Sequence, residues 1–109
     1  MSLENTSVVD AVGVDRSSGN VVLTIADGLD WSAEALHLSL LQDKLNAYFG
    51  FIESGEILES CPAAQGKAIS INVVCRFPLP PSAITLLTEA SKVGAALDVK
   101  ITHQQYAGT

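Results

Sequence analysis

The sequence predicts an α+β fold in which a four-stranded mixed sheet carries two helices on one face. Two runs rich in β-branched residues open the chain and are joined by a turn that contains glycine. Two helical segments then alternate with two further strands, which gives the order ββαβαβ. A helix between two strands implies a parallel crossover, and the preferred hand of such crossovers puts both helices on one side of the sheet.

Turn and cap residues mark the first three elements. VVDAVGVD and VVLTIAD, joined by RSSGN, predict a hairpin with strands at Val8–Asp15 and Asn20–Asp27. After them, Asp30 or Ser32 can cap a helix by accepting a hydrogen bond from a backbone N–H of its first turn.

The first helix is expected to run to about Glu53, and Gly55 is placed to end it in a left-handed conformation. Residues Ile57–Lys67 contain Pro62 and Gly66 and show no periodicity. We therefore predict a connecting loop there.

The second half of the chain reads as strand, helix, strand. The run AISINVVCRF alternates, and its inward residues are Ile69, Ile71, Val73, Cys75 and Phe77. PLPPS breaks the strand and starts a helix, because proline lacks the N–H that a first turn leaves unpaired. The apolar stripe of that helix is Ala83, Leu86, Leu87, Ala90, Val93, Gly94 and Leu97. A last strand is predicted at Leu97–His103.

Length and composition indicate one domain with surplus apolar surface. The 109 residues suffice for one core, so we predict a single domain over 1–109 with frayed tails at 1–6 and 104–109. Apolar residues make up 48% of the chain and charged residues only 17%, against about 25% in a usual soluble domain.

The charge pattern excludes several classes of partner. A net charge of −6 repels phosphate backbones, so we expect no binding to nucleic acid. The six basic residues are scattered, and no apolar run approaches the ~20 residues that span a bilayer, so we expect no membrane binding. The start MSLENTS lacks the basic and apolar regions of a signal peptide, which predicts a cytosolic protein.

One long motif carries a family resemblance. LLQDKLNAYFGFIESGE, at Leu40–Glu56, is preceded by DGLDW and followed by VVCRFPLPP. With these motifs the chain resembles a family of small bacterial proteins of unknown function. The resemblance covers most of the chain, agrees with the predicted fold and implies a bacterial source, and it assigns no site residue.

Glu34 and His37 form an E-x-x-H pair that could hold a metal from one helix face. A site needs further ligands, for which Asp27, Asp30 and His103 are the candidates. The positive end of the helix dipole equally explains acids in a first turn. A small enzyme or metal-binding protein that uses Asp30, Glu34 and His37 therefore stays an alternative, and we expect no cofactor.

The two cysteines show neither CxxC spacing nor a neighbouring histidine, which favours two reduced thiols. Cys61, in the predicted loop, could serve as a nucleophile if a base lay nearby. Cys75 points to the same side of its strand as the core residues, so we expect it to be buried as a small apolar side chain. Outward residues of the sheet could hold a ligand or form a solvated face; they are Ser70, Asn72, Arg76, Lys100 and Thr102.

Glu53, Glu56 and Glu59 gather where the first helix ends, which is unfavourable for negative charge. They could form an acidic patch of an immunity-like protein that binds a basic toxin, or a solvated surface.

The first helix has more apolar residues than one sheet-facing stripe needs. We assign Leu38, Leu41, Leu45, Tyr48, Phe49 and Ile52 to the sheet. A second flank remains, formed by Leu36, Leu40, Ala47 and Phe51. Either the second helix or a second chain covers it. We favour the second chain, and predict a non-enzymatic protein-binding domain that forms a homodimer.

Overall fold

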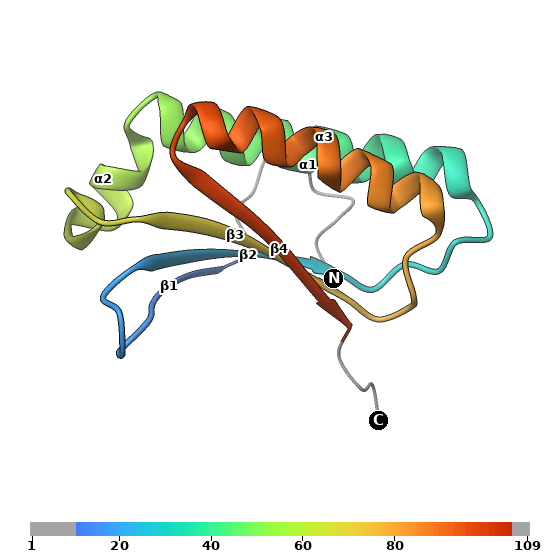
Figure 1. Cartoon of the computed structure of the whole chain (residues 1–109), viewed down its shortest axis with the longest axis horizontal. Helices are drawn as coiled ribbons and strands as arrows, with labels where there is room; N and C mark the ends of the chain where they lie inside the picture. Colours follow the sequence, from blue (N-terminus) through green and yellow to red (C-terminus); the bar gives the residue numbers. More distant parts are fainter. Residues whose placement is uncertain (1–10, 106–109) are drawn as a thin grey trace.

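A layer of helices covers one face of a four-stranded sheet (Figure 1). The computed structural model describes residues 11–105. The strands are β1 (Ala11–Val14), β2 (Val21–Asp27), β3 (Ile69–Cys75) and β4 (Val99–Gln105). The helices are α1 (Glu34–Glu53), α2 (Glu56–Ser60) and α3 (Pro81–Ala96). The predicted mixed sheet and α+β class are confirmed, with α2 as a helix beyond the two predicted.

The strands lie in the sheet in chain order. β1 pairs with β2 antiparallel, and β3 is parallel to both β2 and β4. Asp27 lies opposite Cys75, and Cys75 lies opposite Gln105, so the carboxyl ends of three strands meet at one edge. We call this the carboxyl edge of the sheet.

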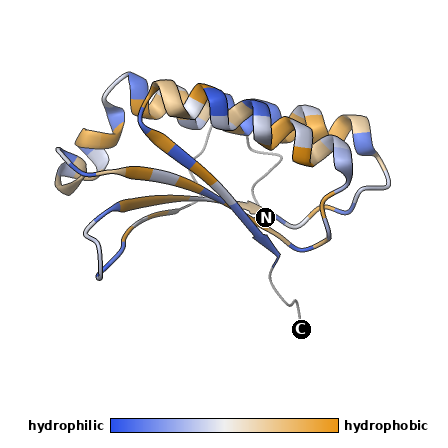
Figure 2. Ribbon diagram, viewed as in Figure 1, coloured by the Kyte–Doolittle hydropathy of each residue, from blue (hydrophilic) through white to orange (hydrophobic). Residues whose placement is uncertain are grey.

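Alternation along the strands builds the core, as the coloured ribbon shows (Figure 2). Ile71, Val73 and Cys75 are buried as predicted. Phe77 was wrongly placed in this row, because β3 ends at Cys75 and the Phe77 side chain beyond it is exposed. Along β2 every second residue is buried, and the last of these is Asp27.

α1 ends as predicted, with Gly55 in the left-handed region at a φ of 87°. Its start differs from the prediction, because neither Asp30 nor Ser32 caps it. Instead, Asp30 Oδ1 accepts hydrogen bonds from the Ser32 N–H and hydroxyl at 3.1 and 2.6 Å. Both side chains are used in the turn before the helix and do not reach its N–H groups.

The sheet-facing stripe of α1 was predicted only in part. Its buried residues are His37, Leu41, Lys44, Leu45, Tyr48 and Phe49. Leu38 and Ile52 are only partly buried, while His37 and Lys44 take buried positions. At about 100° per residue, the helix is therefore turned so that the side nearer Leu40 faces the sheet. Tyr48 donates its hydroxyl proton to the Thr24 carbonyl at 2.5 Å and ties α1 to β2.

The predicted loop at Ile57–Lys67 contains regular structure. α2 is followed by a 3-10 turn at Pro62–Ala64, and Ile57 and Ala64 belong to the core. A five-residue helix is too short to show a 3.6-residue period, which explains why the sequence did not reveal it.

α3 packs closely on β4. The buried residues of its stripe are Ala83, Leu87, Ala90 and Gly94, in agreement with the prediction, whereas Val93 is exposed. A Cβ at Gly94 would lie 2.6 Å from the Val99 carbonyl oxygen. Leu97 follows the helix and is not part of the strand, so β4 begins two residues later than predicted.

β4 continues through Gln105, beyond the predicted end at His103. The first part of the predicted carboxyl-terminal tail, at 104–105, therefore lies in the strand, and 106–109 fall outside the described residues. The predicted tail at 1–6 and the first residues of the predicted strand at Val8–Asp15 also fall outside them. No helix within 11–105 is long and apolar enough to cross a membrane.

Candidate functional site

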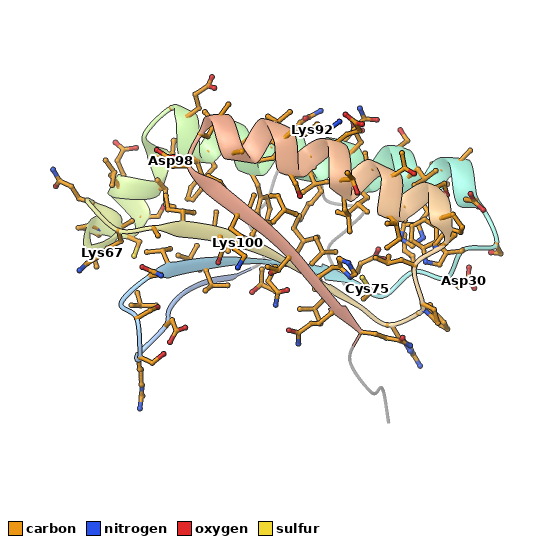
Figure 3. All side chains as sticks on the ribbon, in the orientation of Figure 1. Asp30, Lys67, Cys75, Lys92, Asp98 and Lys100 are labelled. Atoms are coloured by element: carbon orange, nitrogen blue, oxygen red, sulfur yellow. The ribbon has the colours of Figure 1, made fainter. Side chains whose placement is uncertain are left out.

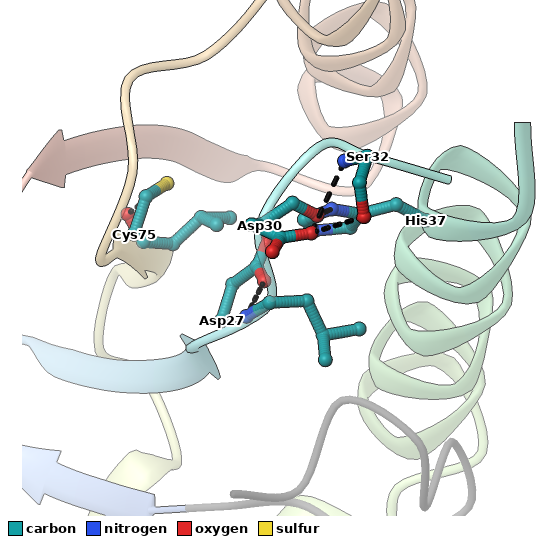
Figure 4. Close-up of polar contacts among 7 residues, drawn as sticks. Asp27, Asp30, Ser32, His37 and Cys75 are labelled. Carbon is teal, nitrogen blue, oxygen red and sulfur yellow. Dashed lines mark hydrogen bonds and ion pairs between the residues drawn. The ribbon is translucent and has the colours of Figure 1, made fainter. Parts of the chain in front are cut away.

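The carboxyl edge is where an open α/β sheet usually places its ligands. Asp27 ends β2, Cys75 ends β3, and the connection from β2 to α1 brings Asp30 and Ser32 beside His37 (Figure 4). Figure 3 shows Asp30 and Cys75 at this end of the molecule, with Lys67 and Asp98 at the other. The polar groups gathered at this edge form the candidate site.

The centre of the site is a buried Asp27–His37 pair. His37 Nε2 lies 2.6 Å from Asp27 Oδ2, and the two side chains are only 2% and 1% exposed. Asp27 Oδ1 also accepts the Leu29 N–H at 3.1 Å. The second ring nitrogen, Nδ1, lies 2.8 Å from the Asp30 carbonyl oxygen. Trp31 stacks on the imidazole with ring centroids 3.5 Å apart and planes 11° from parallel.

The partners of His37 define where its protons lie. A backbone carbonyl can only accept a hydrogen bond, so Nδ1 carries a proton and donates a hydrogen bond to the Asp30 carbonyl oxygen. A second proton lies between Nε2 and Asp27 Oδ2, because two lone pairs would repel each other at 2.6 Å. The pair as a whole is neutral, which allows a carboxyl group and an imidazole to be buried together.

This arrangement limits what His37 can do chemically. A general base needs a nitrogen lone pair within reach of its substrate. Both ring nitrogens of His37 are engaged by oxygen atoms of the protein. The contacts fasten the start of α1 to the end of β2, which is a structural task.

The candidate metal and enzyme residues do not converge. Glu34 is exposed and accepts a hydrogen bond from the Ser82 hydroxyl of α3 at 2.5 Å, whereas His37 points inward to Asp27. Asp30 uses its carboxylate to bind Ser32, and these hydrogen bonds lower its pKa. Residues 11–105 contain no group of three or more His, Cys, Asp or Glu side chains that could hold a metal ion.

Neither cysteine has the surroundings of a nucleophile. Burial, and then the nearby Asp27 carboxylate, raise the pKa of Cys75 to about 11, so its thiol stays protonated at neutral pH. Cys61 follows α2, at the opposite end of the molecule from the carboxyl edge (Figure 1). The two described histidines, His37 and His103, both lie toward the carboxyl edge.

The second flank of α1 faces away from α3. We call it the α1 flank; it consists of Leu36, Leu40, Ala47 and Phe51. The groove between the helices is lined instead by residues such as Leu45 and Phe49 of α1 and Leu86 of α3. Leu36 is 62% exposed, while Leu40 and Phe51 pack partly against the core. Within the described residues, the second helix is therefore not the cover of this flank.

The predicted acidic patch has an ordinary local explanation. Glu53, Glu56 and Glu59 are all exposed. Glu56 is the first residue of α2, where the helix dipole favours negative charge, whereas Glu59 is the fourth of the five residues of this helix. The unfavourable position at the C-terminal end of a helix therefore does not apply to Glu56.

The polar residues on the helix-free face of the sheet bind one another. Asn72 donates to Gln104 Oε1 at 3.3 Å and accepts from the Thr102 hydroxyl at 3.1 Å. Ser70 and Lys100 line a shallow hollow of about 260 Å³ beside them. Arg76 lies past the end of β3 and is exposed.

Asp27 and Trp31 are the site residues whose roles the sequence did not reveal. Asp27 could have been found, because it continues the inward row of β2 and an acid at a core position calls for a partner. The stacking of Trp31 had no comparable signal.

The family comparison agrees with the resemblance seen in the sequence. A family model described as a family of unknown function, DUF6572, matches residues 1–107. The chain belongs to this family. Searches of curated proteins and of solved structures find no match. Membership in DUF6572 therefore assigns no activity to the carboxyl edge, and the function must be argued from the residues.

Proposed function

We propose that the protein is a non-catalytic protein-binding domain that forms a homodimer through the α1 flank. The observation that carries the proposal is the position of α3, which packs on the other side of α1 and leaves Leu36 exposed. The commitment of both His37 nitrogens and the protonated Cys75 thiol support a role without catalysis.

The α1 flank is too small to form a stable dimer interface by itself. Leu36 and Phe51 are fifteen positions apart, about 22 Å along a helix. A stripe of that length and ~10 Å width gives about 220 Å², whereas a stable interface buries about 800 Å² on each partner. Neighbouring surface must contribute, and β1 supplies it with the exposed residues Val12 and Val14 on the helix side of the sheet. Twofold symmetry then lets one apolar patch bury itself.

Leu36→Glu tests the proposal with little risk to folding, because Leu36 is mostly exposed. Leu40→Glu and Phe51→Glu are less suitable, since both residues also pack against the core. Val93→Glu is the matched control, because Val93 is exposed on α3 and lies outside the α1 flank.

In size-exclusion chromatography with light scattering, the wild type and Val93→Glu should have the mass of two chains, and Leu36→Glu the mass of one. Thermal melts should show that all three are folded. A wild type that stays monomeric at high concentration, or a Leu36→Glu variant that stays dimeric, would refute the proposal.

We also place the domain in the cytosol, which the free thiols of Cys61 and Cys75 support because disulfides are favoured outside it. Recovery of the native protein from the culture medium would contradict this placement.

A further inference from the structure

We propose that the outer edge of β4 and the cleft beside it bind an extended acidic segment of a partner protein, which joins the sheet as a fifth strand. The occupant is thus a peptide in strand conformation with an apolar side chain for the cleft and carboxylates near it. This surface does not include the α1 flank, so the proposal does not depend on the homodimer.

The first observation is the open edge of β4. All seven residues of β4 pair with β3, from Val99 opposite Ile69 to Gln105 opposite Cys75. Among the strands of residues 11–105, no partner lies on the other side of β4, which is the nearest strand in Figure 1. No strand of the described part of the chain pairs with the backbone N–H and C=O groups that point outward there, so they can serve as a template for another chain. The other edge strand, β1, has only four described residues and offers a shorter template.

The second observation is a cleft of about 320 Å³ where β4 meets the start of α3. Its apolar wall comes from the segment that joins β3 to α3 and from α3 itself: Phe77, Pro78, Leu79 and Ile84. Cys75, and the last residues of β4, line the remainder. Ile84 is 42% exposed, which leaves apolar surface available to a partner.

Strand geometry links the edge to the cleft. On β4 the helix-side residues become more exposed toward the end of the strand, from buried Val99 to exposed His103. In a strand added beside β4, alternate side chains point to the same side as α3. One of them would lie next to Ile84 and Phe77, and the cleft is large enough for a valine, leucine or phenylalanine side chain. Backbone pairing would give affinity and the cleft would give sequence preference, as in other cases of strand addition.

Charge favours an acidic occupant. The whole chain carries −6, yet within residues 11–105 no carboxylate lines this cleft. His103 is part of the lining, and the Arg76 guanidinium lies 5.6 Å from the centre of the Phe77 ring. Lys100 is the second residue of β4, nearer the start of the strand (Figure 3). Asp98 precedes the first residue of β4, at the end of the strand away from the cleft. Complementary charge selects partners and speeds their encounter.

The test uses a soluble fluorescein-labelled probe peptide, Glu-Val-Glu-Phe-Glu-Val-Glu, titrated against the full chain and followed by anisotropy. We expect saturable binding. Two N-methylated versions separate backbone pairing from side-chain contact, because each blocks the amides on one side of the extended peptide. One version should bind at least about tenfold more weakly, since three lost hydrogen bonds of 0.5–1.5 kcal/mol each amount to a factor of ten or more. The other should bind nearly as well as the parent peptide.

Protein variants test the cleft and the charge separately. Ile84→Ser, which changes no charge, should weaken binding about tenfold or more, whereas Val93→Ser, on the same helix but away from the cleft, should not. Arg76→Glu should weaken binding of the acidic probe and strengthen binding of a peptide with lysine in place of glutamate. Circular dichroism melts establish that each variant is folded.

Absence of saturable binding would overturn the proposal. So would equal weakening by both N-methylated peptides, or an Ile84→Ser variant that binds like Val93→Ser. Equal binding of the lysine and glutamate peptides to the wild type would overturn the assignment of an acidic occupant.

Discussion

The buried Asp27–His37 pair makes the sharpest prediction about stability. His37→Phe retains a ring that can stack on Trp31 but removes both hydrogen bonds of the imidazole. The buried Asp27 carboxylate would then lose His37 and keep its hydrogen bond from the Leu29 N–H. Breaking a buried pair from one side costs about 3–5 kcal/mol, because the other group loses its partner without regaining water.

The matched variant removes both groups. Asp27→Leu/His37→Phe removes the carboxyl group from this site, and replacement of a buried pair by apolar residues of similar volume is often neutral or stabilising. We therefore expect the double variant to recover most of the stability that the single variant loses. Loss of the hydrogen bonds to Leu29 and Asp30 keeps the recovery incomplete.

Urea unfolding followed by fluorescence measures these free energies. Trp31 is the single tryptophan of the chain and lies against residue 37, so its emission reports on this site. Global unfolding should be followed in parallel by circular dichroism. The total free energy of unfolding of a small domain is only about 5–15 kcal/mol, so a loss of this size can unfold the whole chain. A His37→Phe variant within 1 kcal/mol of the wild type, or a double variant less stable than the single one, would refute this reasoning.

Two further predictions follow from packing and burial. Because the pKa of Cys75 is raised to about 11 in the fold, the folded protein holds the thiol proton more tightly than the unfolded chain, whose cysteine has its ordinary pKa near 9. The free energy of unfolding should therefore fall between about pH 9 and 11, by up to about 3 kcal/mol. Urea titrations of the wild type at a series of pH values measure this loss. The same loss in Cys75→Val would show that another group causes it. Gly94→Ala should cost about 1–3 kcal/mol, since its Cβ would lie 2.6 Å from the Val99 carbonyl oxygen. Gly50→Ala, in open space on α1, should stabilise by about 0.5–1 kcal/mol, and similar melting temperatures for the two variants would contradict the close packing of α3 on β4.

Patterns that repeat along the chain allowed the fold class to be predicted. Alternation in β3 identified its buried row, and the spacing of apolar residues identified α1 and α3 as amphipathic helices. Gly55 marked the end of α1, because a left-handed residue is needed there and glycine adopts that conformation without strain. These signals are local, so the sequence alone determined them, together with the order of all strands and helices except α2.

The sequence also indicated the α1 flank, but it left open which neighbour covers it. The arc of apolar residues on α1 is a local property, whereas the position of α3 depends on how both helices settle on the sheet. Its packing beside Leu45 and Phe49 became visible only in the tertiary structure.

The pairing of Asp27 with His37 in the candidate site was decided by the tertiary structure. Asp27 and His37 are ten positions apart, and no periodic pattern relates the last residue of a strand to the first turn of the next helix. Their meeting depends on the path of the connection between β2 and α1 and on the rotation of α1 about its axis. That rotation also buried Lys44 and left Leu38 only partly covered. Periodicity predicts the buried face of a helix only to within about one residue, or 100° of rotation about the helix axis. Packing against the sheet then determines which polar side chains of α1 are buried in the core.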